Sequence, residues 1–218
     1  MMLKLFWQDP YQTKGSATVT SIVRNKIKLD QTIFFAFSGG QESDEGTIGG
    51  IKVLQVVKLG DKENIIDIEY ELETEPTFKV GDTVEISINS ERRKKLRDLH
   101  SATHIVYYMF SQKYGKQKII GSHIAPEKAR IDFEFGQPLQ ELLPELEQEV
   151  NAFLAEEHAI VRKPDEKSSD LWWWICEEWK MPCGGTHPQN TFEIGTVKLK
   201  RKNIGKGKER IEIYLQSF

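Results

Sequence analysis

The chain has 218 residues, of which 39% are hydrophobic and 29% are charged, and its formal net charge is −3. This balance is typical of a globular protein that buries a core of its own, and it excludes a disordered or fibrous chain. The sequence shows neither the apolar core of a signal peptide nor the roughly 18 consecutive apolar residues of a spanning helix, and it has only two cysteines. A cytoplasmic protein without a disulfide framework is therefore predicted.

The first part of the chain, from Leu3 to about Ile88, has the pattern of short strands. Apolar and polar residues alternate in SATVTSIVRNKIKLD, QTIFFAF and GDTVEISIN, and turn pairs such as Gly60-Asp61 and Gly81-Asp82 separate the alternating runs. A period of two residues with many β-branched side chains indicates strands joined by hairpins. We therefore predict a small β-barrel domain over residues 1–88.

The periodicity changes at Asn89-Ser90, where a long helix is predicted to begin. Apolar positions recur at three- and four-residue spacing as far as Phe110, with Ser90 as the N-cap and Gly115 as the C-terminal stop. A second amphipathic helix is predicted around residues 142–154, with strands before it in KIIGSHIAPEKARIDFEFG and after it in LWWWICEEW, TFEIGTVKLKRKN and ERIEIYLQSF. These elements predict an α+β domain over residues 89–218, in which helices form one layer and a mainly antiparallel sheet the other.

Two pairs of residues have the spacing of metal ligands. His100 and His104 lie four residues apart on the predicted helix, so both imidazoles project from one face. In MPCGGTHPQN, Cys183 and His187 flank a glycine pair that lets the loop bring both side chains to one ion. Three imidazoles and a thiolate favour one zinc ion over magnesium or calcium, with iron and nickel as alternatives. Four protein ligands suit a closed structural site and an open position suits a catalytic one, so both roles remain alternatives.

The other cysteine and histidines lack a partner at ligand spacing. Strand alternation places Cys176 on the same face as Trp172 and Trp174, which predicts a small buried hydrophobe. His123 and His158 are likewise predicted to have structural roles.

Basic residues are concentrated in two stretches. KLKRKNIGKGKER has a single opposing acid, Glu209, and its glycines predict a flexible loop; its cations are Lys198, Lys200, Arg201, Lys202, Lys206, Lys208 and Arg210. The second cluster, on the polar face of the predicted long helix, consists of Arg92, Arg93, Lys94, Lys95 and Arg97. Such runs form either solvated surface or phosphate contacts.

At HSATH and CGGTH the sequence resembles the editing domain of alanyl-tRNA synthetase and the free-standing AlaX proteins, which deacylate mischarged alanine tRNA. The resemblance continues through GSHIAPEKARIDFE and CGGTHPQNTFEIGTVKLKRKNIGKGKERIEI, so it covers most of residues 89–218. Editing domains of threonyl-tRNA synthetase commonly have proline before the last histidine, where this chain has Thr186. With no aminoacylation segment and no long helical tail, the chain resembles the medium-length AlaX type, which implies ATP-independent editing in trans by a monomer.

The segment FFAFSGGQESDEGTI resembles the glycine-rich motif of the β-barrel that precedes the editing domain, with matches at Gly39, Gly40, Gln41, Asp44 and Gly46. In the family this motif faces the catalytic cavity and helps to distinguish serine from alanine, so the resemblance implies a polar contact between Gln41 and substrate. From its residues alone, the segment predicts a β-turn with a capping aspartate. Ala36, Phe37 and Ser38 depart from the motif, which weakens what it implies about serine selectivity.

The resemblance implies a zinc-dependent hydrolase that releases serine, and in a further hypothesis glycine, from mischarged alanine tRNA. The acceptor end of the tRNA would then be the partner of the basic stretch at residues 198–210. The metal would activate water or orient the substrate, and the two roles rank equally. Two alternatives remain: a non-catalytic RNA-binding module whose zinc pins the helix to the CGGTH loop, and an enzyme that edits mischarged threonine tRNA.

Overall fold

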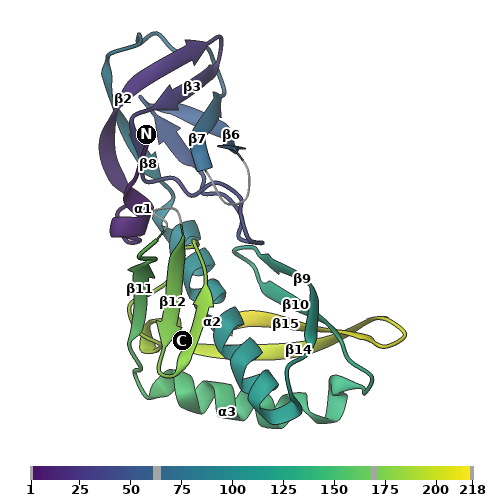
Figure 1. Cartoon of the computed structure of the whole chain (residues 1–218). Coiled ribbons are helices and arrows are strands. Elements are labelled where there is room, and N and C mark those ends of the chain that lie inside the picture. The colour runs from purple at the N-terminus through teal and green to yellow at the C-terminus, as the bar shows by residue number, and fades with distance from the viewer. Residues whose placement is uncertain (1, 61–64, 168–170, 217–218) are drawn as a thin grey trace.

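The computed structural model describes residues 2–60, 65–167 and 171–216, and it is rich in strands, as the sequence predicts. Six antiparallel strands of the first half close into a barrel in the order β2-β3-β7-β6-β5-β8 (Figure 1). Their bounds are β2 Lys14–Val23, β3 Lys26–Leu29, β5 Gly46–Ile48, β6 Ile51–Gly60, β7 Ile65–Leu72 and β8 Thr83–Ile88. The predicted turn at Gly81-Asp82 is present, with Gly81 at φ 94°, whereas Asp61 lies outside the described residues.

A short N-terminal segment packs against the barrel. It forms β1 (Leu3–Lys4), which pairs in parallel with β4 (Gln31–Thr32), and then the single-turn helix α1 (Leu5–Gln8). Phe6 and Trp7 of α1 are buried in the same apolar cluster as the barrel side chains. The glycine-rich segment runs between β4 and β5 and leaves the barrel on the side of the second half.

The long helix α2 (Ser90–Tyr114) leads from the barrel into the second half (Figure 1). Its N-cap is Asn89, whose side chain accepts a hydrogen bond from the backbone N–H of Arg92 at 3.0 Å. The predicted cap at Ser90 was therefore wrong by one residue, because the amide oxygen of Asn89 reaches the free N–H of the first turn and Ser90 is already helical. The helix ends where predicted, at Gly115, which has φ 78°.

A four-stranded antiparallel sheet and a second helix surround α2. The sheet has the order β14-β15-β10-β9, and helix α3 (Leu143–Ala155) packs against β14 with Pro144 in its first turn, as predicted. A 3₁₀ helix (Leu139–Glu141) precedes α3. The strands are β9 Lys118–Ile124, β10 Ala129–Glu134, β14 Thr196–Gly205 and β15 Lys208–Gln216.

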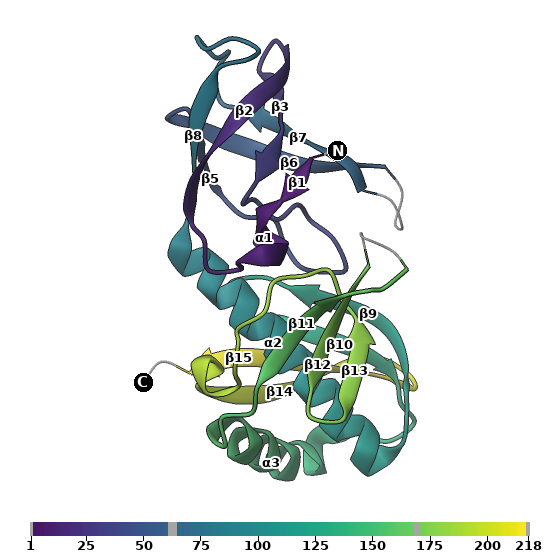
Figure 2. The ribbon, with the colours of Figure 1, turned by 60° about the vertical axis from the view of Figure 1, so that its left-hand side comes forward.

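The tryptophan-rich segment forms a separate small sheet. Its antiparallel strands follow the order β11-β12-β13, and they lie beside α1 of the first half (Figure 2). Their bounds are β11 Ile160–Pro164, β12 Trp172–Cys176 and β13 Trp179–Pro182, and a 3₁₀ helix (Phe192–Ile194) follows before β14.

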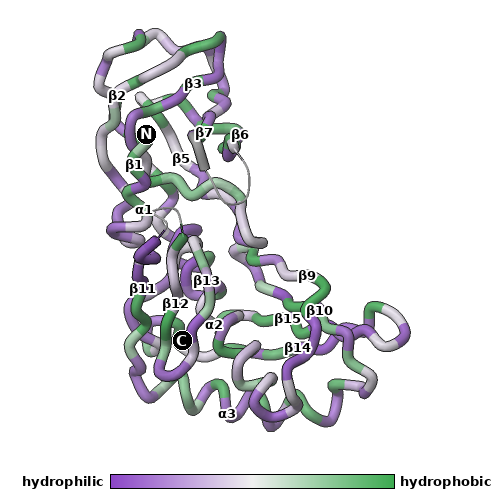
Figure 3. The backbone as a smooth tube through the Cα atoms, in the orientation of Figure 1, coloured by the Kyte–Doolittle hydropathy of each residue, from purple (hydrophilic) through white to green (hydrophobic). Residues whose placement is uncertain are grey.

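The buried apolar side chains fall into two clusters. One contains residues from Met2 to Ile88, and the other contains residues from Leu96 to Ile213. Apolar and polar residues alternate along the strands of both halves, as expected for strands with one buried face (Figure 3). Within the part of the chain that the structure describes, no helix is long and apolar enough to span a membrane.

Candidate metal centre

Helix α2 places two imidazoles side by side. His100 and His104 are one helical turn apart, and their ring centroids lie 4.7 Å from each other. Both side chains are buried, so they lie on the inner face of the helix and not on its solvent-exposed face. The predicted pair therefore points into the protein.

The CGGTH loop brings the other two predicted ligands to the same place. The backbone N–H of Cys183 donates to the carbonyl of Trp172 at 2.7 Å, and the indole N–H of Trp7 donates to the carbonyl of Gly184 at 2.8 Å. A Cβ atom on Gly185 would lie 2.2 Å from Cε1 of His100 and 2.8 Å from Oε1 of Gln41. Only glycine allows the loop to approach the helix this closely, which gives Gly185 a structural reason.

One ligand atom from each of His100, His104, Cys183 and His187 lies within 4.8 Å of the others. Sγ of Cys183 lies 3.1 Å from Nε2 of His187 and 3.5 Å from Nε2 of His100. Nδ1 of His104 is buried and has no hydrogen-bond partner among the described residues, so the cluster contains a polar atom that its protein neighbours leave unsatisfied. Imidazole and thiolate donors at this separation fit one ion of the zinc class.

Burial keeps all four donors uncharged in the metal-free protein. It lowers the pKa of His100 to about 3, with a smaller contribution from the guanidinium of Arg162, and it holds the pKa values of His104 and His187 well below the ordinary value. Neutral imidazole is the form that binds metal. Burial also raises the pKa of the Cys183 thiol to about 11, so binding of an ion has to displace the thiol proton.

Two side chains contact the Nδ1 atoms of His187 and His100. The hydroxyl of Ser101 lies 2.8 Å from Nδ1 of His187 and accepts from the indole N–H of Trp174 at 3.2 Å. Oε1 of Gln41 lies 2.7 Å from Nδ1 of His100. The sequence reading missed Ser101 and Trp174; the available signal was that a buried indole N–H needs a partner.

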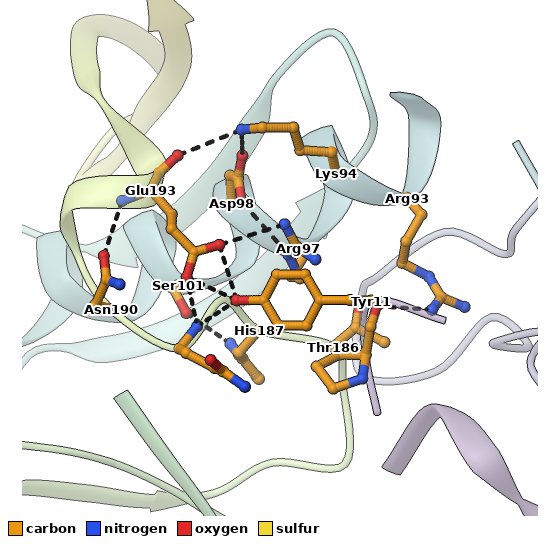
Figure 4. Close-up of polar contacts among 12 residues, drawn as sticks. Tyr11, Arg93, Lys94, Arg97, Asp98, Ser101, Thr186, His187, Asn190 and Glu193 are labelled. Carbon is orange, nitrogen blue, oxygen red and sulfur yellow. Dashed lines mark hydrogen bonds and ion pairs between the residues drawn. The ribbon is translucent and has the colours of Figure 1, made fainter. Parts of the chain in front are cut away.

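A second polar network lies next to Ser101 and His187, along the first half of α2 (Figure 4). The hydroxyl of Tyr11 donates to Glu193 at 2.6 Å and accepts from the backbone N–H of Gln189 at 2.8 Å. The guanidinium of Arg97 lies 3.8 Å from the centroid of the Tyr11 ring. These contacts tie the N-terminal segment to the chain that follows His187.

A cavity of about 370 Å³ opens beside the cluster, and both halves of the chain line it. Its wall is mostly apolar, and the described residues that line it include no carboxylate. The first half contributes Phe6, Trp7, Phe35, Ala36, Ser38, Gly39, Lys58 and Ile68; the second contributes His100, Thr103, His104, Tyr107, Ile119, Ser122, Ile124, Ile131, Leu171, Trp172, Met181, Pro182, Cys183, Gly184 and Gly185. Gln41 is fully buried and lies outside this lining.

The remaining cysteine and histidines lie outside the group of four. Cys176 is fully buried, and burial raises its pKa to about 12. Nε2 of His123 lies 3.0 Å from a carboxylate oxygen of Glu42, and the ring of His158 stacks on Phe153 at 3.9 Å between centroids.

The basic stretch at residues 198–210 is not a flexible loop. It forms most of the β14-β15 hairpin, and its two glycines make the turn, with φ 135° at Gly205 and 68° at Gly207. Four of its seven cations are engaged within the protein: Lys198 with Glu147, Arg201 with Glu209, Arg210 with Asp132, and Lys200 over the ring of Tyr214. Lys202, Lys206 and Lys208 are exposed near the tip and form no ion pair with any residue that the structure describes.

The cations of the α2 cluster are also paired with acidic residues. Arg93 is bound by Asp44, with both side chains about 1% exposed, and Arg92 is bound by Glu42. The three others have acidic partners too: Lys94 with Asp98, Lys95 with Glu91, and Arg97 with Asp98 and Glu193.

Known domain families match both halves of the chain. The family described as "Threonyl and Alanyl tRNA synthetase second additional domain" matches residues 175–212, which contain Cys183 and His187. The family described as "tRNA synthetases class II (A)" matches residues 7–92, which contain the glycine-rich segment.

Individual proteins are similar over nearly the whole chain. The alanyl-tRNA editing protein AlaX-M of Pyrococcus horikoshii is 34% identical, and the match covers 99% of both chains. The alanine–tRNA ligase of Methanococcus aeolicus is 30% identical over 95% of this chain, and that of Sulfurisphaera tokodaii is 28% identical over 90%. These matches cover 25% and 24% of the two ligases, so the chain spans about a quarter of their length.

Proposed function

Because this chain belongs to the family of alanyl-tRNA editing proteins, we propose that it is a hydrolase that deacylates mischarged alanine tRNA in trans. Ser-tRNA(Ala) is the proposed substrate, with Gly-tRNA(Ala) as a second one. The observation that carries the proposal is the convergence of three buried imidazoles and a thiol, three of which, His100, His104 and Cys183, line the wall of a cavity. A cavity of about 370 Å³ has room for an aminoacyl group and part of the nucleoside that bears it.

The proposed cofactor is one zinc ion, held by His100, His104, Cys183 and His187. The mixed nitrogen and sulfur donor set and the neutral state of the imidazoles support this choice. We assign the barrel domain to residues 1–88 and the metal-binding editing domain to residues 89–218. Both contribute to the cavity wall, so the substrate would be bound by the two together.

The reaction is hydrolysis of an ester. The oxygen of a water molecule forms a bond to the carbonyl carbon, the bond from that carbon to the ribose oxygen breaks, and a proton passes from the water to the ribose oxygen. A bound zinc ion supplies Lewis-acid chemistry at such a centre, either toward the water or by orienting the substrate. None of the described residues of the wall is a carboxylate that could act as a general base. The apolar wall would exclude bulk water from the ester.

The proposed contact with the tRNA is the tip of the β14-β15 hairpin. Of the predicted cations, Lys202, Lys206 and Lys208 are the exposed ones with neither an ion pair nor a ring contact among the described residues, so they can neutralise phosphate. Lys198, Lys200, Arg201 and Arg210 hold the hairpin together in our proposal, because their charges already face acidic groups or a ring. The hairpin projects beyond the body of the protein (Figure 1).

A substrate panel tests the proposal. Purified protein is incubated with Ser-, Gly- and Ala-charged alanine tRNA and with Ser-charged threonine tRNA, and release of the amino acid is followed over time. We expect release of serine from alanine tRNA, little release of alanine, and loss of release in Cys183→Ala. Preference for the mischarged threonine tRNA would favour the second alternative. If no amino acid is released from any of these tRNAs, the enzymatic proposal is refuted. A Cys183→Ala variant that then loses only stability would favour the alternative of an RNA-binding module stabilised by zinc.

A further inference from the structure

We infer that Gln41 is a positioning residue of the metal centre: its side-chain amide fixes the ring orientation and tautomer of His100 and anchors the CGGTH loop. This inference rests on the proposed metal centre, but not on the identity of the substrate. It assigns to the barrel half a part in orienting the metal ligands. It also differs from the contact between Gln41 and substrate that the glycine-rich motif implies.

The hydrogen bonds around Gln41 determine which nitrogen of His100 carries the proton. The backbone N–H of Thr186 can only donate, so the Gln41 atom 3.1 Å away from it is the amide oxygen. Nδ1 of His100 lies 2.7 Å from the same oxygen, and it must therefore be the protonated nitrogen. The lone pair is then on Nε2, which faces Sγ of Cys183 at 3.5 Å. This is the tautomer that a metal bound through Nε2 requires.

The other end of the amide holds the metal loop. Nε2 of Gln41 donates to the hydroxyl of Thr186 at 2.9 Å, so both the backbone and the side chain of Thr186 are bound by one residue. Thr186 precedes His187, and it is fully buried. One glutamine thus connects a ligand on α2 with the loop that carries the other two.

Burial argues against a contact between Gln41 and substrate in this arrangement. The Gln41 side chain is 0% exposed and does not line the cavity, although Ser38 and Gly39 of the same segment do. Both lone pairs of Oε1 have donors, from Thr186 and His100. The residues of this segment that can touch a ligand are therefore its neighbours.

The glycine-rich segment is built to deliver Gln41 to this position. Two backbone hydrogen bonds attach it to β9. The N–H of Ile124 donates to the carbonyl of Gly40 at 2.8 Å, and the carbonyl of Ile124 accepts from the N–H of Glu42 at 3.0 Å. Gly40 has φ 89°, and a Cβ atom there would lie 2.9 Å from Oγ of Ser122, so the close approach requires glycine. Three residues beyond Gln41, the carboxylate of Asp44 is bound by Arg93 of α2.

The test measures metal binding in the absence of tRNA. Cobalt or zinc affinity is determined by competition with a chelator for the wild type, Gln41→Met and Gln41→Glu, with Gln55→Ala as a matched removal of an exposed amide from the barrel. Gln41→Met keeps the length of the side chain and removes its hydrogen bonds, so we expect affinity to fall roughly 10- to 100-fold. Gln41→Glu keeps an oxygen acceptor for His100 and Thr186, and we expect it to restore most of the affinity.

NMR of the imidazole nitrogens in the metal-free protein reports the tautomer of His100, which a packing defect alone would not change. We expect His100 as the single Nδ1–H tautomer in the wild type and as a mixture of tautomers in Gln41→Met. If Gln41→Met fails to fold, Gln41→Asn, which withdraws the oxygen by one carbon, takes its place.

Wild-type metal affinity in Gln41→Met, together with a changed preference for serine over alanine, would overturn the inference in favour of a substrate contact. An affinity lowered equally by Gln41→Met and Gln41→Glu would also overturn it, because the acceptor would then have no role. If metal binding depends on Gln41 but the wild type deacylates no tRNA, the proposed function fails while the inference stands.

Discussion

Removal of one partner from the buried ion pair between Arg93 and Asp44 should strongly destabilise this protein. Nε of Arg93 donates to a carboxylate oxygen of Asp44 at 2.9 Å, and its Nη1 donates to the carbonyl of Pro10 at 3.1 Å. Asp44 in turn accepts from the backbone N–H of Phe35 at 2.7 Å. Both side chains are about 1% exposed, so the pair joins the glycine-rich segment to the first turn of α2 away from water.

Replacing Asp44 with alanine leaves the Arg93 guanidinium buried without its counter-charge. Removal of one partner of such a pair costs about 3–5 kcal/mol, because desolvation of the remaining charge is no longer offset. The Phe35 N–H loses its acceptor as well, which adds to the penalty. An exposed pair gives the contrast: Lys118→Ala breaks a contact with Glu134 at side chains 71% and 47% exposed, where the expected loss is about 0–1 kcal/mol.

Urea unfolding followed by circular dichroism measures both variants against the wild type. A second comparison is the double variant Asp44→Leu/Arg93→Met, which removes both charges and should be less destabilised than Asp44→Ala. A loss below about 1 kcal/mol in Asp44→Ala would refute the reasoning, since it would mean that water reaches the guanidinium.

Three further changes have defined outcomes. Acidifying the metal-free protein below about pH 6.5 should lower its stability by up to about 1.4 kcal/mol per pH unit for each site histidine. The sign follows because their folded pKa values are depressed, to about 3 for His100, so the unfolded chain binds more protons; a flat urea midpoint between pH 7 and pH 5 would contradict it. Gly185→Ala should abolish cobalt binding through the clash with His100, whereas Gly136→Ala, with nothing within 4 Å of the added Cβ, should not; equal cobalt titrations would exclude the clash. Alanine at all three of Lys202, Lys206 and Lys208 should weaken tRNA binding and reduce its salt dependence by about one unit of slope per lost phosphate contact, while Lys198→Ala should have a smaller effect; an unchanged slope would remove the hairpin tip from the interface.

The local patterns of the sequence predicted the elements that carry the ligands. The spacing of apolar residues predicted α2, and with it the shared face of His100 and His104, because helical periodicity is a property of neighbouring residues. The glycine pair beside Cys183 predicted a tight loop, and the close contact of Gly185 with His100 gives the physical reason. The predicted alternation in the first half likewise corresponds to strands.

Local sequence patterns could not predict contacts between segments that are distant in the sequence. The acidic partners of Arg92 and Arg93 lie about 50 residues away in the sequence, so the α2 cluster looked like free positive charge. The stretch at residues 198–210 looked flexible because its pairing depends on the β15 partners and on Asp132 of β10. The bond between Gln41 and His100 joins the two halves of the chain, and no local periodicity encodes it.

Serine release from Ser-tRNA(Ala) under single-turnover conditions tests the central claim most directly. The rate is measured for the zinc-loaded protein, for the same protein after chelation, and after zinc is restored. We predict release that disappears on chelation and returns with zinc, because His100, His104 and Cys183 of the four-donor cluster line the cavity and its described lining residues include no carboxylate. Release that continues undiminished in the chelated protein would contradict a metal-dependent editing site.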